Sequence, residues 1–150
     1  MKPITLISLL TTATMAMASP PIARQTQTQN LRLSDTTAQI SADNSVGTIT
    51  MHVQNPNTNS DWIPCTIKWN PNEIISSAQT IHCKNNEYNV RFPSGLGDDI
   101  EFFTLEVDWI VTGGNPQTAQ WKFEAGTDWQ CQKNTSPDVK ENCLLEGARV

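Results

Sequence analysis

The amino-acid sequence predicts an all-β protein, a single small antiparallel β-barrel or β-sandwich held together by two disulfides. Several segments alternate apolar and polar residues with a period of two, which is typical of half-buried strands. Turn-forming residues recur between these segments, and no window of helical length carries an apolar stripe with a 3.6-residue period. An even number of cysteines, four in all, supplies the two disulfides.

The first two predicted strands occupy the segments 31–40 and 47–53, in which apolar and polar residues alternate. The sequence Asp43-Asn44-Ser45 between them is typical of a turn. Residues 55–59 predict a second turn, because proline lacks an amide donor and asparagine tolerates turn geometry.

Two short runs of β-forming residues each carry one cysteine. Residues 62–69 contain Cys65, and residues 81–83 contain Cys83 and precede a further β-forming run, residues 88–92. A bridge between the two cysteines would link neighbouring strands and set the register of the chain that follows.

The clearest predicted strand covers residues 101–111, whose side chains alternate strictly between two faces. Residues 113–116 predict a turn, and residues 119–123 continue the alternation on a return strand, so this part predicts a β-hairpin. Trp129 and Cys131 resume the pattern. We expect residues 133–142 to form a polar loop and residues 144–150 to add a closing strand.

The N-terminal residues predict export of the chain. Residues 1–18 combine an early lysine, a short apolar core and an A-x-A cleavage site, as in a secretory signal peptide. Residues 19–30 are polar and predict a flexible arm, and residues 31–150 are long enough for one β-barrel domain. The net charge of −5 without a basic stripe argues against binding to nucleic acid or to an anionic membrane.

The cysteines Cys65, Cys83, Cys131 and Cys143 predict two disulfides in an exported chain. Four cysteines allow three connectivities, and pairing of nearest neighbours along the chain is the simplest. A metal site is disfavoured, since no C-x-x-C spacing occurs and the histidines are only His52 and His82.

The sequence predicts neither an enzyme nor a cofactor site. The G-x-S-x-G motif of serine hydrolases is absent, and His52 and His82 have no partners that mark them as catalytic. Glu106 and Asp108 share one strand face, but such a pair is typical of a solvated surface.

A partner or ligand surface is predicted from exposed aromatic and apolar residues. Phe102 and Ile110 flank Glu106 and Asp108 on the outward face of the long strand, where they would form an apolar patch if no second layer covers them. Trp62 could stack on a sugar ring, a flavonoid or a partner protein. Asn134 begins a glycosylation sequon, weakened by Pro137.

Several of these motifs resemble one known family. The chain is similar to the fungal Alternaria major-allergen family in the motifs Asp61-Trp62-Ile63-Pro64-Cys65 with Trp69, Ile81-His82-Cys83 with Tyr88-x-Val90-Arg91-Phe92, Phe103-Thr104-Leu105-Glu106-Val107, Trp129-x-Cys131 and Cys143-Leu144. The resemblance covers residues 31–145. It implies a small secreted β-barrel whose bridges join the first cysteine to the second and the third to the fourth.

The resemblance also implies a place and a role. Members are found in the fungal cell wall or the host apoplast, act as allergens, effectors or elicitors, and share no catalytic machinery. Some bind thaumatin-like plant defence proteins or carry flavonoid-type ligands. Members that form covalent dimers use an extra cysteine near the mature N-terminus; this chain has none there, so we expect no covalent dimer.

The leading expectation is therefore a non-enzymatic secreted effector, elicitor or allergen-like protein that binds a host defence protein. A carrier of a small aromatic ligand is one alternative, and would have a pocket lined by Trp and Phe. A carbohydrate-binding protein of the cell wall is the other, and would be retained on chitin or glucan through Trp62.

Overall fold

The computed structural model describes residues 30–58, 60–84, 86–110, 117–126, 128–146 and 149. The predicted signal peptide, residues 19–29 of the predicted arm and the predicted turn at 113–116 lie outside these residues. The described residues form nine strands and no helix: β1 (Arg32–Ser41), β2 (Gly47–Gln54), β3 (Ile63–Trp69), β4 (Ile81–His82), β5 (Tyr88–Arg91), β6 (Phe102–Trp109), β7 (Gln117–Glu124), β8 (Trp129–Ser136) and β9 (Val139–Leu145).

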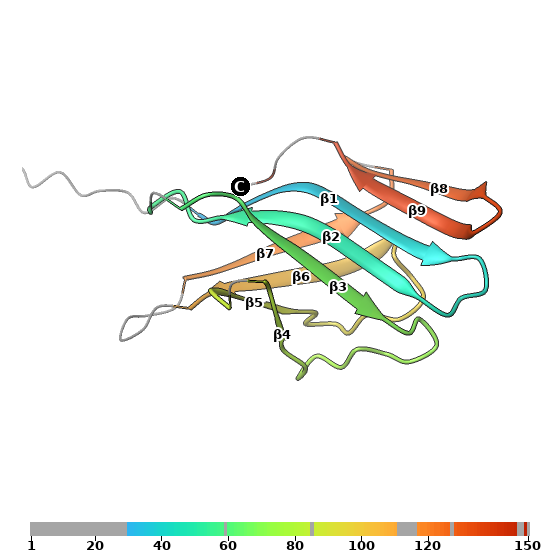
Figure 1. Cartoon of the computed structure of the whole chain (residues 1–150), viewed down its shortest axis with the longest axis horizontal. Coiled ribbons are helices and arrows are strands. Elements are labelled where there is room, and N and C mark those ends of the chain that lie inside the picture. Colours follow the sequence, from blue (N-terminus) through green and yellow to red (C-terminus); the bar gives the residue numbers. More distant parts are fainter. Residues whose placement is uncertain are drawn as a thin grey trace, which may run out of the picture.

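The strands form two antiparallel sheets that face each other (Figure 1). One sheet has the order β3-β2-β1-β9-β8, and the other has the order β4-β5-β6-β7. Within the described residues the sheets are not closed into a barrel, so the β-sandwich is the form that the predicted all-β fold takes.

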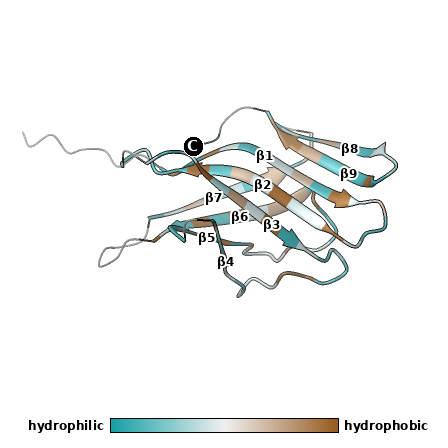
Figure 2. Cartoon of the chain, in the orientation of Figure 1, coloured by the Kyte–Doolittle hydropathy of each residue, from teal (hydrophilic) through white to brown (hydrophobic). Residues whose placement is uncertain are grey.

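Alternation of hydrophobic and hydrophilic residues explains this architecture (Figure 2). Every second residue of β2 is buried, and on β6 the buried residues are those predicted to share one face, from Phe103 to Val107. The inner faces of both sheets meet in one core. Its largest fully buried side chains are Trp129, Tyr88, Phe92 and Phe123.

The two disulfides pair Cys65 with Cys83 and Cys131 with Cys143, as expected from nearest-neighbour pairing. Cys65 lies on β3 and Cys83 directly follows β4, so the first bridge joins the edges of the two sheets rather than two hydrogen-bonded strands. Cys131 and Cys143 lie opposite each other on β8 and β9.

The C-terminal third differs from the prediction. Residues 133–142 are not a polar loop, because β8 and β9 pair as a hairpin that turns at Pro137 and Asp138. The closing strand predicted at residues 144–150 also lies elsewhere, since β9 begins at Val139 and ends at Leu145; residues 147, 148 and 150 lie outside the described residues. Further along, Arg149 exchanges two backbone hydrogen bonds with Leu33 of β1, and its Nη1 donates to the carbonyl oxygen of Lys122 on β7 at 2.7 Å, so this residue contacts both sheets.

Candidate functional site

The predicted surface on β6 is divided in the structure. Phe102 at the start of the strand and Ile110 just beyond its end are 55% and 41% exposed. They lie eight residues apart, roughly 26 Å along an extended strand. Trp62, 38% exposed, precedes β3 in the other sheet, at the end of the sandwich away from Phe102.

The stretch between Phe102 and Ile110 is polar. Arg91 of β5 places Nη2 2.5 Å from Glu106 Oε1 and 2.7 Å from Asp108 Oδ2. Thr118 and Gln120 of β7 donate hydrogen bonds to the same two carboxylates. The five residues of the predicted surface therefore do not form one apolar patch, because an ion-paired band separates Phe102 from Ile110.

Phe102 and Ile74 line one hollow, which we call the apolar hollow after these two exposed side chains, although its other lining residues include polar ones. This surface hollow has a volume of about 450 Å³ and is lined by Pro71, Asn72, Ile74, Ser94, Gly95, Leu96, Gly97, Asp98, Asp99 and Phe102. Ile74 is 76% exposed, more than any other large hydrophobic residue among those described. Phe102 is exposed as predicted, but it lines this hollow with Ile74 instead of forming an apolar patch with Ile110.

Two loops build the apolar hollow, one after β3 and one after β5. Ile75 and Leu96 exchange backbone hydrogen bonds of 2.8 and 3.1 Å between these loops. Trp69, at the end of β3, donates from Nε1 to the carbonyl oxygen of Gly97 at 2.8 Å. The hollow is therefore held by hydrogen bonds to a buried strand end rather than by the loops alone.

We expect Gly47→Ala to lower the free energy of unfolding by about 1–3 kcal/mol. A Cβ atom at Gly47 would overlap Cε2 and Cζ2 of Trp69, the side chain that holds Gly97. Urea denaturation of the variant measures the loss. The matched control is Gly97→Ala, whose Cβ would meet Ile74 at an ordinary 3.6 Å. Equal stability of the two variants would contradict this explanation.

A second hollow adjoins the first, and we call it the charged hollow. Its volume is about 310 Å³, and it is lined by Asp98, Asp99, Glu101, Lys133, Lys140 and Glu141. Asp98 and Asp99 line both hollows, so the two hollows adjoin at these residues.

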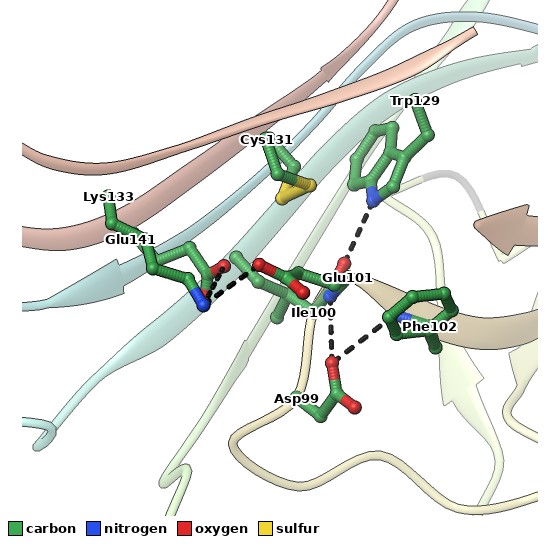
Figure 3. The surroundings of a disulfide bond; sticks show 9 residues. Asp99, Ile100, Glu101, Phe102, Trp129, Cys131, Lys133 and Glu141 are labelled. Carbon is green, nitrogen blue, oxygen red and sulfur yellow. Dashed lines mark hydrogen bonds and ion pairs between the residues drawn. A yellow bond between two sulfur atoms is a disulfide. The ribbon is translucent and has the colours of Figure 1, made fainter. Parts of the chain in front are cut away.

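A lysine and two glutamates meet in the charged hollow (Figure 3). Lys133 Nζ lies 2.9 Å from Glu101 Oε1 and 3.9 Å from Glu141 Oε1. The Glu141 side chain is only 7% exposed, because it shares the inner face of β9 with Cys143 and Leu145. The two carboxyl groups also lie close enough to shift each other's pKa values.

This arrangement moves the two pKa values apart. Burial, followed by the hydrogen bond to Glu101, raises the pKa of Glu141. The hydrogen bond from Lys133, followed by that from Glu141, lowers the pKa of Glu101. Glu101 therefore ionises more readily than Glu141, and its carboxylate lies beside the ammonium of Lys133.

Hydrogen bonds on either side fix the position of Glu101. Trp129 Nε1 donates to the carbonyl oxygen of Ile100 at 2.8 Å. Asp99 Oδ1 accepts hydrogen bonds from the amides of Glu101 and Phe102 at 3.0 and 3.3 Å (Figure 3). The start of β6 is thus anchored where the two hollows meet.

The carboxyl pair does not suit glycoside hydrolysis. Retaining glycosidases separate their carboxyl groups by about 5–5.5 Å, and inverting enzymes separate theirs further. Glu101 Oε1 and Glu141 Oε1 lie 2.9 and 3.9 Å from the same atom, Lys133 Nζ, so a lysine rather than a sugar ring lies between the two carboxyl groups. What the arrangement offers chemically is a buried carboxyl group, Glu141, whose ionised form a positive charge entering the hollow would favour.

We expect Glu141→Gln to gain stability relative to the wild type as the pH rises. The raised pKa of Glu141 gives stability that is full below the ordinary value of 4.5 and is lost as pH rises through the raised value. Glutamine stays neutral at every pH, so the variant does not lose this contribution to stability as the pH rises.

Urea denaturation at several pH values measures this difference. The control is Glu101→Gln, which removes a carboxylate whose lowered pKa stabilises the fold above pH 4.5 and should therefore act with the opposite sign. A difference between Glu141→Gln and the wild type that does not change with pH would contradict the assignment.

Sequence reasoning missed Glu141 and Lys133, because it placed both in a polar loop. One signal was available: Glu141, Cys143 and Leu145 alternate along the chain, so a buried cysteine and leucine place the glutamate on the inner face. No comparable pattern marked Ile74, which lies outside any strand.

The other predicted residues occupy ordinary positions. His52 Nδ1 lies 3.3 Å from Asp35 Oδ2, and His82 is exposed on β4. Within the described part of the chain, no group of three His, Cys, Asp or Glu residues could hold a metal ion. Asn134 is exposed on β8, and its glycosylation stays a prediction.

The fold and its hollows define a disulfide-linked β-sandwich with an exposed apolar and acidic surface at one end. No protein-family model matches the sequence, and a search of curated proteins finds no significant relative. The two disulfides are compatible with an extracellular location. None of the described segments is a helix long and apolar enough to cross a membrane.

Proposed function

We propose that this chain is a secreted, non-enzymatic fungal protein of the Alternaria major-allergen type, which acts as an effector, elicitor or allergen-like protein by binding a plant defence protein. The motif resemblance described above supports the class. The apolar hollow supports the binding role, and the observation that carries it is the exposure of Ile74 and Phe102 on one hollow.

Exposed apolar side chains that gather on one surface are typical of interaction sites. Here the loops that carry them are joined by the bonds between Ile75 and Leu96 and anchored through Trp69. A surface that is already ordered loses less conformational entropy on binding, so more of its contact energy appears as affinity. A thaumatin-like defence protein is the partner that the resemblance favours.

The test is capture of a purified thaumatin-like protein, and of proteins from plant apoplastic fluid, by the immobilised oxidised chain. We expect Ile74→Ser with Phe102→Ser to weaken capture at least about tenfold, as loss of a binding hot spot would. The matched control is Ile110→Ser, an exposed apolar residue beyond the other end of β6.

A reduced and alkylated sample shows whether the folded state is required. Capture that survives the double substitution unchanged, or that is equally strong with the reduced chain, would contradict the proposal. If no protein is captured, the proposed binding of a host protein is contradicted, and carriage of a small ligand becomes the favoured function.

A second candidate, carriage of a flavonoid-type ligand, is favoured by the size of the apolar hollow. Its volume of about 450 Å³ falls within the range of roughly 300–1,000 Å³ typical of small-molecule sites, but of the aromatic residues expected for a carrier its lining includes only Phe102 and no tryptophan. Trp69 bonds to Gly97 in the wall of this hollow, so its fluorescence should report occupancy. Titration with quercetin should give a saturable change that Phe102→Ala weakens; a change that is not saturable would exclude carriage there.

A further inference from the structure

The charged hollow contains a buried oxygen that lacks a hydrogen bond. Glu141 is 5% exposed, and its Oε1 atom accepts no hydrogen bond. The nearest cation, Lys133 Nζ, lies 3.9 Å away and is 2.9 Å from Glu101 Oε1. Since a buried acceptor without a partner costs about 1–3 kcal/mol, a donor that entered the hollow would relieve this cost.

The charges around Glu141 favour a positive group. The lining residues of the hollow bring four carboxyl groups, from Asp98, Asp99, Glu101 and Glu141, against two ammonium groups. One of these, Lys140, donates to Asn44 Oδ1 at 3.0 Å, and the other, Lys133, pairs with Glu101. The acidic groups therefore outnumber the cations that could neutralise them.

We propose that the two hollows together bind a basic segment of a partner protein, with an arginine side chain in the charged hollow and a neighbouring apolar side chain on Ile74 and Phe102. This inference rests on the proposed function and specifies the chemistry of the partner. Asp98 and Asp99 line both hollows, so an arginine and an apolar side chain of one short segment can reach the two subsites together.

Arginine fits this site better than lysine does. Its guanidinium group presents five donors in one plane and is more weakly hydrated than an ammonium group. It can therefore donate to Glu141 Oε1 and to an aspartate of the shared wall at the same time. Entry of a permanent positive charge favours the ionised form of Glu141, so binding should strengthen as rising pH ionises this carboxyl group, whose pKa burial raises.

The charged groups that face Glu141 from each neighbouring element all influence how its ionisation, and therefore binding, depends on pH. They are Asp98 and Asp99 of the loop before β6, Glu101 at the start of β6, Lys133 of β8 and Lys140 of β9. Glu101 is already held in its charged form by Lys133, so Glu141 is the group whose protonation changes on binding.

The test uses two matched peptides, acetyl-Gly-Leu-Arg-Leu-Gly-amide and the same peptide with citrulline in place of arginine. Citrulline has nearly the same shape and no charge. Amide signals in the ¹⁵N NMR spectrum of the full folded chain are followed during titration. We expect saturable shifts at Asp98, Asp99, Lys133 and Glu141 with the arginine peptide, and at least about tenfold weaker binding with citrulline.

Variants assign the binding to the charged hollow. Glu141→Gln should reduce binding of the arginine peptide about tenfold and remove its increase with pH. The control is Glu106→Gln, which removes a carboxylate from the outer face of β6 that already pairs with Arg91. Equal binding of both peptides, undiminished binding by Glu141→Gln, or no shift at these signals would overturn the inference.

The same variants separate this inference from the proposed function. If Glu141→Gln leaves host-protein capture unchanged, the inferred binding of a basic segment is wrong, but the proposed binding of a host protein still stands. Arginine-specific peptide binding without capture of any host protein would refute the function and keep the subsite.

Discussion

Trp129→Ala is expected to lower the free energy of unfolding by about 3–5 kcal/mol, the largest effect of any single substitution considered. The Trp129 ring is fully buried, and its centroid lies 4.8 Å from that of Phe123 and 5.9 Å from that of Phe103. Alanine would leave a cavity between the two sheets. A small domain has only about 5–15 kcal/mol of net stability, so much of it would be lost.

Two variants separate packing from hydrogen bonding at this position. Trp129→Phe keeps an aromatic ring but leaves the buried carbonyl oxygen of Ile100 without its donor, which should cost about 1–3 kcal/mol. Trp62→Ala removes a tryptophan that is 38% exposed and should cost no more than about 1 kcal/mol. Urea denaturation followed by circular dichroism measures all three; similar losses for Trp62→Ala and Trp129→Ala would contradict this account.

Trp129→Phe should also disturb the charged hollow. The carbonyl group of Ile100 immediately precedes Glu101, so the indole donor helps to place the Glu101 carboxylate beside Lys133. In the peptide titration we therefore expect Trp129→Phe to weaken binding of the arginine peptide. Binding equal to that of the wild type would show that Asp99 alone positions the start of β6.

Strands that bury one face could be predicted from the sequence, and exposed strands could not. β2 and β6 alternate because one face of each packs against the opposite sheet. From Lys133 to Ser136, β8 is exposed at every residue, so it has no buried face to impose a period of two. Asn134, with a positive φ of 54°, interrupts the strand further. The β8–β9 hairpin was therefore mistaken for a loop.

The candidate site was harder to predict because it is built from tertiary neighbours. The alternation of residues along β6 correctly predicted that Phe102 points outward. It contained no information on which loops from elsewhere in the chain lie near this side chain. Ile74 comes from a loop that is placed through Leu96, and a buried glutamate such as Glu141 has the residue type of a surface group. Pairing between distant segments brings these residues together.

Removal of the Cys65–Cys83 disulfide is the second large effect that we expect. The bridge spans 18 residues and the Cys131–Cys143 bridge spans 12, so loop entropy predicts similar losses of about 3 kcal/mol for either double alanine variant. The local consequences should differ. The first bridge joins the two sheets at their edge strands, whereas the second lies within a paired hairpin.

The short strand β4 depends on the first bridge. It pairs with β5 only through Ile81 and His82, and the amide of the following Cys83 donates to the carbonyl oxygen of Tyr88 at 3.0 Å. Without the bridge, few contacts hold this edge to the sandwich, so it should open locally without global unfolding. The β8–β9 hairpin keeps its ladder of pairs when its own bridge is removed.

Native-state hydrogen exchange measures this difference at single amides. In Cys65→Ala with Cys83→Ala, the amides of residues 81–83 should exchange much faster than in the wild type. The amides of β1 and β2 should exchange faster only by the amount that the loss of global stability predicts. The Cys131→Ala with Cys143→Ala variant is the matched control, and its amides at 81–83 should change only with the global stability. Equal exchange at residues 81–83 in the two variants, once corrected for stability, would show that β4 is held by packing of the loops around Ile75 and Leu96 rather than by the bridge between the sheets.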